Sequence, residues 1–145
     1  MVQDWHRKFG VLNRNVPELA DEQTDRLRIG LIAEELQEFV NALGFKWMSY
    51  ETIQAWIQRS IPERHEGDLV KLADAIGDLL YVVYGAAVTY GIDMEPIFVE
   101  IHRSNISKGE PEIVRAPNGK ILKGKQWTPP NLISILDRQM KRSER

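Results

Sequence analysis

The sequence contains no cysteine among its 145 residues. This absence excludes disulfide bonds and thiolate metal sites, and it fits the reducing cytoplasm in which we expect the protein. The charges nearly cancel, to a formal net charge of -2, so no overall basic field would attract nucleic acid. The opening MVQDWHRKF lacks the apolar stretch of a signal peptide, and the longest apolar run, Leu79 to Val88, is too short to span a bilayer. We therefore expect neither a nucleic-acid partner nor a membrane partner.

Apolar residues recur at helical spacing along most of the chain, and residues typical of helix caps divide it into about five helical segments. Asp21 and Asp93 are expected to begin helices, and Gly10, Gly44 and Gly91 to end them. The expected helices run from Val2 to Phe9, from Asp21 to Leu43, from Tyr50 to about Arg59, from Leu69 to Tyr90 and from Asp93 to about Ile106. The pattern predicts an all-α fold, and the length fits a single domain, residues 1–145.

The pattern changes after Gly109. Two short alternating segments, EIVR and KILK, flank the turn signal Pro117-Asn118-Gly119, which predicts a small β-hairpin at about residues 112–125. In the tail, residues 129–145, a narrow apolar stripe from Asn131 to Met140 predicts a helix that docks on the domain or on another copy. We expect the hairpin and the tail to be appendages of the single domain.

Each of the two long predicted helices has an apolar face and a face that carries carboxylates. In the first helix, Glu34 and Glu38 lie about 40° apart around the helix axis, and Glu35 lies at the edge between the two faces. In the second, Asp74 and Asp78 share one side with Tyr81. The residues expected to face the core are Ile29, Ile32, Leu36, Phe39, Val40 and Leu43 in the first helix, and Ile76, Leu79, Leu80, Val83 and Ala87 in the second.

If the two carboxylate rows converge, their like charges repel strongly unless cations neutralise them. Oxygen ligands favour Mg²⁺, Mn²⁺ or Ca²⁺ over zinc or copper. The three histidines, His6, His65 and His102, supply none of the Glu-x-x-His pairs that carboxylate-bridged di-iron bundles require. Acidic residues at this spacing are also common on solvated helix faces, but two matched pairs favour a divalent metal site.

Several segments, in this order, resemble a known family, the all-α nucleoside-triphosphate pyrophosphohydrolases, which include MazG, dimeric dUTPases and phosphoribosyl-ATP pyrophosphohydrolase. The resemblance covers nearly the whole chain and is closest to the MazG-like branch. Its segments are FG at Phe9, RLRIGLIAEELQEFVNAL from Arg26, LADAIGDLLYVVYGAAVTYGID from Leu72, HRSNISKGEP from His102 and NGKILKGKQWTPP from Asn118. The resemblance implies a helical bundle that is completed by oligomerisation, as a homodimer or homotetramer.

The resemblance also implies a metal site. The EExxE motif of the family implies that Glu35 and Glu38 bind Mg²⁺, with Mn²⁺ as a possible substitute, and that Glu34 either joins them or orients water. Asp78 matches the most regular aspartate of the family. Many relatives have glutamate three residues before it, where this chain has Ala75, and Asp74 lies four residues before it on the same face. We therefore expect Asp74 and Asp78 to complete the ligand set.

Residues on the phosphate side come from the later segments. The resemblance implies that Lys108 pairs with phosphate oxygens and that Asn105 contacts phosphate or sugar. Lys120 and Lys123 could close over the phosphates, although lysines on a turn more often face solvent. Tyr81 and Trp47 could touch a base, although aromatic residues more often pack in a core.

The expected reaction is Mg²⁺-dependent hydrolysis of a nucleoside triphosphate to a nucleoside monophosphate and pyrophosphate, with Glu34 helping to activate water. The substrate would be a deoxynucleotide or a non-canonical nucleotide, with dUTP as one possibility. Two alternatives stay open. One is hydrolysis of phosphoribosyl-ATP, and the other is a helical oligomer that binds a nucleotide and has lost catalysis.

Overall fold

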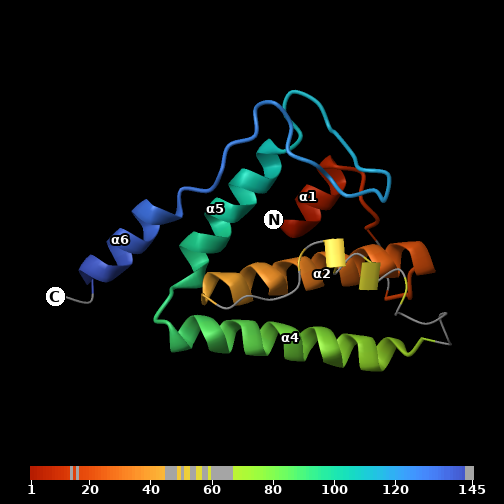
Figure 1. Cartoon of the computed structure of the whole chain (residues 1–145), viewed down its shortest axis with the longest axis horizontal. Coiled ribbons are helices and arrows are strands. Elements are labelled where there is room, and N and C mark those ends of the chain that lie inside the picture. Colours follow the sequence, from red (N-terminus) through yellow and green to blue (C-terminus); the bar gives the residue numbers. More distant parts are fainter. Residues whose placement is uncertain are drawn as a thin grey trace. The chain divides into compact units, whose positions relative to one another are not determined.

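The structure is a computed structural model that describes residues 1–13, 15, 17–44, 49, 51–52, 55–56, 59 and 67–142. These residues form five α-helices, shown in Figure 1: α1 (Val2–Lys8), α2 (Glu22–Ala42), α4 (Leu69–Thr89), α5 (Met94–Ser107) and α6 (Leu132–Arg142). The predicted all-α class is confirmed. By their contacts, the residues divide into two compact units, one formed by Met1–Val16 with Val70–Arg145 and the other by Pro17–Leu69. The single-domain assignment stays a prediction.

The helix ends follow from the cap residues found in the sequence. The Asp21 side chain accepts a hydrogen bond of 2.8 Å from the Thr24 amide at the start of α2. Asp93 does the same for the Glu95 amide at the start of α5, at 3.1 Å. Left-handed glycines follow three of the helices: Gly10 at φ 55°, Gly44 at φ 85° and Gly91 at φ 65°. Each lies where a side chain would strain the backbone, so local chemistry explains these boundaries.

Two predictions fall wholly or largely outside the described residues. The short helix expected from Tyr50 to about Arg59 includes only five described positions, all of them helical. Trp47, the other aromatic proposed to touch a base, is not described.

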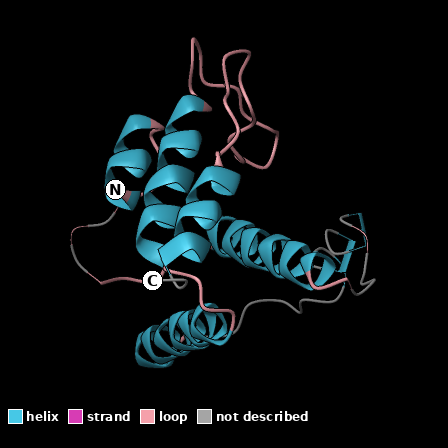
Figure 2. Ribbon diagram, turned by 90° about the vertical axis from the view of Figure 1, so that its left-hand side faces the viewer, coloured by secondary structure: helices cyan, strands magenta, loops and turns pink. Residues whose placement is uncertain are grey.

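In the larger unit, α5 contacts both α1 and α6 (Figure 2). The buried apolar side chains of this unit come from all its parts: Phe9, Ala87, Ile97, Ile121 and Ile135. The tail prediction is confirmed in one respect, because α6 docks on α5 of its own chain through the buried Ile135. A hydrogen bond from the Asp93 amide to the Gln139 side chain, at 2.9 Å, ties the two helices together.

The β-hairpin predicted at about residues 112–125 is not confirmed. The predicted turn is present, since the Gly119 amide donates to the Ala116 carbonyl at 2.9 Å. Only one antiparallel bridge follows, between Arg115 and Ile121, and no strand forms in the described part of the segment. The pairing ends because the chain turns to α5 instead, where the Gly124 amide donates to the Lys108 carbonyl at 3.2 Å.

Of the residues predicted to face a core from the two long helices, Ala87 is buried, whereas the others are partly or largely exposed. On α2, Ile29, Ile32, Leu36, Phe39 and Leu43 are between 38% and 51% exposed, and on α4, Ile76, Leu79, Leu80 and Val83 are between 44% and 57% exposed. Each helix has a single buried residue, Gly30 in α2 and Ala87 in α4. Helical periodicity predicts which residues share a face, but it does not supply the neighbour that covers that face.

By length and composition α4 could also cross a membrane, since its mean hydropathy reaches 1.4. A helix that packs between other helices has the same composition, so this property does not decide between the two.

Candidate functional site

The first group of predicted site residues lies on α2, in the smaller unit. Glu34 is half-buried, while Glu35 and Glu38 are exposed. Glu34 and Glu38 are four residues apart within one continuous helix, so both carboxylates project from the same side of α2. This confirms the helical spacing from which the site was predicted.

The second group lies on α4, in the larger unit. Asp74 and Asp78 are exposed and are also one helical turn apart. Tyr81 is 81% exposed, so its ring is not part of a core. The role of Tyr81 in binding a base stays a prediction.

Within each unit, no three described acidic or histidine side chains come together as a metal-binding group. Each long helix supplies a pair of carboxylates on one side, which is an incomplete coordination shell for a divalent ion. The donors themselves fit Mg²⁺ or Mn²⁺, because all of them are carboxylate oxygens and none is sulfur or nitrogen. The ligand set of Glu35, Glu38, Asp74 and Asp78 therefore stays a prediction.

The third group gathers at the C-terminal end of α5. Asn105 lies in the last turn of the helix and Lys108 is its C-cap residue, and both are half-buried. The Lys108 amide donates to the Asn105 carbonyl at 3.3 Å, which closes the last turn. The segment that follows Lys123 binds the same helix end, because the Gly124 amide donates to the Lys108 carbonyl and the Gln126 amide to the Glu110 carbonyl, each at 3.2 Å. The structure thus brings the SNxSK element and the lysine-bearing turn together.

The two lysines of the turn differ in their surroundings. Lys120 is half-buried, and its amide donates to the Asn118 side chain at 3.1 Å. Lys123 is exposed, and its Nζ lies 4.1 Å from the ring centroid of Trp127. Cation–π contacts of this kind are worth about 0.5–1 kcal/mol at exposed sites. Lys123 therefore has a fixed alternative partner that a phosphate would have to replace.

A network of polar side chains that the sequence did not reveal fastens the following segment to α5. Arg103 donates to the Thr128 hydroxyl at 2.6 Å and to the Pro129 carbonyl at 2.9 Å. Glu100 accepts from Arg103 and from the Asn131 amide, and these bonds, the one from Arg103 above all, lower the pKa of Glu100 to about 2. The spacing of Glu100 and Arg103, three residues apart on a helix, could have indicated that the two side chains form an ion pair. Their partners 25 to 31 residues away leave no signal in the sequence.

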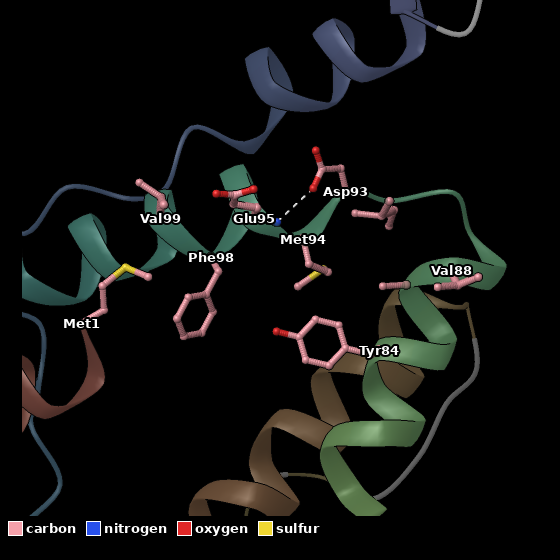
Figure 3. Close-up of a pocket in the computed structure, with 10 residues that line it drawn as sticks. Met1, Tyr84, Val88, Asp93, Met94, Glu95, Phe98 and Val99 are labelled. Atoms are coloured by element: carbon pink, nitrogen blue, oxygen red, sulfur yellow. Dashed lines mark hydrogen bonds between the residues drawn. The ribbon is translucent and has the colours of Figure 1, made fainter. Parts of the chain in front are cut away.

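A pocket of about 630 Å³ lies at the corner between α4 and α5 of the larger unit (Figure 3). Tyr84, Met94 and Phe98 point into it in the close-up, and its lining is mostly apolar. The Asp93 carboxylate in the lining accepts a hydrogen bond from the Glu95 amide and so caps α5. None of the predicted site residues lines this pocket, so it adds no group to the proposed chemistry.

Comparison with known proteins assigns the chain to a family. Residues 2–105 match the model of a family described as phosphoribosyl-ATP pyrophosphohydrolase. The chain belongs to the phosphoribosyl-ATP pyrophosphohydrolase family. The matched region contains both carboxylate helices and Asn105.

Two individual proteins are also similar to this chain. An uncharacterized protein of Acanthamoeba polyphaga mimivirus is 33% identical over 98 residues, a match that covers 65% of this chain and 31% of that protein. The chain therefore matches only about a third of the length of that relative. The crystal structure of a candidate NTP pyrophosphohydrolase from Exiguobacterium sp. 255-15 has a TM-score of 0.74 at 23% identity, with 98% of this chain and 95% of that chain covered. At this identity the likeness shows the fold, which matches the all-α prediction.

Proposed function

We propose that this protein hydrolyses a nucleoside triphosphate to a nucleoside monophosphate and pyrophosphate, with Mg²⁺ as its cofactor. The observation that supports the proposal is the family match over residues 2–105, because it spans the two helices that carry paired carboxylates. Water attacks a phosphorus atom of the anhydride between the α- and β-phosphates, and the bond from that phosphorus to the bridging oxygen breaks. The nucleoside monophosphate and pyrophosphate then separate, and the proton lost by the water passes to Glu34 or to solvent.

The carboxylates have two roles in this proposal. Glu35, Glu38, Asp74 and Asp78 hold the metal, and Mn²⁺ would serve as a substitute. Glu34 accepts a proton from the attacking water or orients it, and its half-buried position suits a group that must be shielded from bulk solvent. When bound, Mg²⁺ supplies positive charge that offsets the charge of the triphosphate and makes water a better nucleophile.

The end of α5 and the turn beside it bind the phosphates and the nucleoside. Lys108 pairs with phosphate oxygens, and Asn105 contacts phosphate or sugar. Lys120 and Lys123 close over the phosphates, an arrangement supported by the contact of their segment with Lys108. Tyr81, with its exposed ring, offers a surface on which a base can stack.

The preferred substrate is a deoxynucleotide or a non-canonical nucleotide, and dUTP belongs in the first panel tested. A second candidate, phosphoribosyl-ATP, is favoured by the description of the matching family. That match ends at residue 105, whereas the lysine-bearing turn follows it. Involvement of the turn lysines therefore separates the two candidates.

A homodimer or homotetramer is the assembly that we propose, because the apolar faces of α2 and α4 are uncovered in the isolated chain. In this proposal the protein is cytoplasmic and α4 packs on helices of another copy instead of crossing a membrane. Sedimentation in detergent-free buffer distinguishes the two, since a membrane helix would aggregate and an oligomer would give one discrete mass.

The reaction is tested by incubating the purified protein and Mg²⁺ with canonical and modified nucleoside triphosphates and with phosphoribosyl-ATP, and by measuring release of pyrophosphate. We expect Glu38→Ala to lower turnover by more than about 100-fold, since even residues that only support metal ligands contribute 10- to 100-fold. The matched control is Glu22→Ala on the same helix, which removes an exposed ion pair with Arg26 and should leave turnover unchanged.

Three results would overturn parts of the proposal. Absence of turnover across the panel, with Mg²⁺-dependent nucleotide binding retained, would support the alternative of an inactive binding protein. Turnover of phosphoribosyl-ATP alone would support the second substrate. Full activity of Glu38→Ala would exclude this glutamate from the metal site.

A further inference from the structure

Two side chains of α1 donate hydrogen bonds to backbone carbonyls at the C-terminal end of α5, beside the proposed phosphate site. The Trp5 indole Nε1 donates a hydrogen bond of 3.1 Å to the backbone carbonyl of Asn105. Lys8 Nζ donates to the next carbonyl, that of Ile106, also at 3.1 Å. These carbonyls lie at the helix end, where the regular partners four residues ahead are missing. Each accepts a hydrogen bond from the turn that ends α5, from the Lys108 amide at 3.3 Å and from the Gly109 amide at 3.4 Å, and α1 supplies a second donor to each.

The contact from Lys8 also suits the electrostatics of the helix end. The C-terminus of a helix carries a partial negative charge, which a lysine ammonium stabilises. Lys8 additionally lies 3.4 Å from a carboxylate oxygen of Glu110, just beyond the helix. One cation thus bridges the end of α5 and the residues that follow it.

The donor helix is itself held in place. The Phe9 side chain is fully buried, and its ring lies 4.7 Å from the ring of Trp5, centroid to centroid. A Cβ atom at Gly109 would lie 2.6 Å from the Phe9 ring, so this position leaves no room for a side chain. The Arg115 guanidinium also donates to the Phe9 carbonyl. These contacts hold the end of α1, and with it the Trp5 indole, in a fixed position.

We infer that Trp5 is a positioning residue for the phosphate side of the site: its indole N–H fixes the backbone of Asn105 and, through the Asn105–Lys108 turn, the direction of both side chains toward the ligand. The inference rests on the proposed function, in which Asn105 and Lys108 bind the substrate. It adds to that proposal a residue in α1, a helix to which neither the motif resemblance nor the carboxylate pattern assigns a role.

The test replaces Trp5 with phenylalanine, which keeps an aromatic ring against Phe9 and removes the N–H donor. One hydrogen bond has a modest net value, so we expect kcat/KM to fall about fivefold, with KM bearing most of the change. The matched control is Trp56→Phe at an exposed tryptophan in the other unit, which should leave kcat/KM within about twofold.

A double-mutant cycle separates positioning from general support of the fold. If Trp5 acts through the Asn105 and Lys108 side chains, Trp5→Phe should change kcat/KM by less than about twofold in a background that carries Asn105→Ala and Lys108→Ala together. Equal losses in the wild-type and double-variant backgrounds would overturn the inference, because they would show that Trp5 acts independently of both side chains. Unchanged kcat/KM in the single variant would overturn it as well.

A second measurement distinguishes failure of this inference from failure of the proposed function. Binding of inorganic pyrophosphate in the presence of Mg²⁺ is followed by calorimetry for the wild type and Trp5→Phe. Weaker binding by the variant supports the inference even where turnover is too slow to measure. A wild type that neither binds pyrophosphate nor hydrolyses any nucleotide would overturn the proposed function and this inference together, whereas an active wild type with an unaffected variant would overturn the inference alone.

Discussion

The end of α5 and the two carboxylate helices are built in opposite ways. At the end of α5, α1 supplies hydrogen bonds, a buried ring and an ion pair from residues about 100 positions away, and the segment after residue 121 adds backbone hydrogen bonds from much closer in the sequence. The helices α2 and α4 have regular carboxylate spacing, but each buries only one residue in the isolated chain. The end of α5 is thus held by contacts within one chain, whereas α2 and α4 bury few residues, and we propose that another copy covers them.

The largest expected difference between the regions concerns two phenylalanines. Phe9 is fully buried beside α5, whereas Phe39 on α2 is 44% exposed. We expect Phe9→Ala to lower the free energy of unfolding by about 3–5 kcal/mol, since it removes a packed ring and leaves a cavity. Phe39→Ala should lower it by less than about 1 kcal/mol in a monomer, because part of the ring already contacts water. Urea unfolding followed by circular dichroism measures both.

Protein concentration sharpens this comparison. If the α2 face is covered by another copy, Phe39→Ala should weaken self-association, and its effect should grow as the concentration is raised. The effect of Phe9→Ala should stay the same at every concentration. Equal destabilisation by the two substitutions in a dilute monomer would contradict the difference in burial.

Alanine substitutions at two glycines should change the stability by smaller amounts and in opposite directions. A Cβ at Gly109 would meet the ring of the buried Phe9, so Gly109→Ala should destabilise the fold by about 1–3 kcal/mol. A Cβ at Gly85 on α4 would meet nothing within 4 Å, so Gly85→Ala should stabilise the exposed helix by about 0.5–1 kcal/mol. Thermal unfolding of both variants measures the sign. Loss of stability in Gly85→Ala together with a lower oligomeric mass would show that a neighbouring copy packs against this position.

The regions also differ in how far the sequence predicts them. The starts of α2 and α5 follow from the aspartate caps, and the ends of α1, α2 and α4 follow from the left-handed glycines; these boundaries were predicted within about two residues. Burial on the apolar faces was predicted correctly for Ala87 but not for the other residues, because periodicity defines a face without defining what covers it. The hairpin failed for a related reason: Gly124 pairs with the Lys108 carbonyl, a competitor that alternation within the segment does not reveal.

For the candidate site, spacing predicted that Glu34 and Glu38, and likewise Asp74 and Asp78, share a side of one helix. Their convergence into one metal site depends on packing between helices, which spacing does not determine, so it stays a prediction. The contacts of Trp5 with Asn105 and of Arg103 with Thr128 were not predictable, because they join residues 100 and 25 positions apart. Such contacts depend on tertiary structure and leave no periodic signal.

The smallest expected effect concerns the acid sensitivity of the fastening at Glu100. Bonds from Arg103, and then from the Asn131 amide, lower the pKa of Glu100 to about 2 from an ordinary value of about 4.5. A carboxylate with a lowered pKa in the folded state stabilises the fold above its ordinary pKa, and this contribution is lost as the pH falls toward the folded value. We therefore expect Glu100→Gln to melt below the wild type at pH 6, and the gap to narrow between about pH 4.5 and pH 2. In an Arg103→Met background, where the main cause of the lowered pKa is absent, the difference in melting temperature caused by Glu100→Gln should be small at every pH. If the difference in the presence of Arg103 stayed constant down to pH 3, the bonds to Glu100 would not depend on its charge.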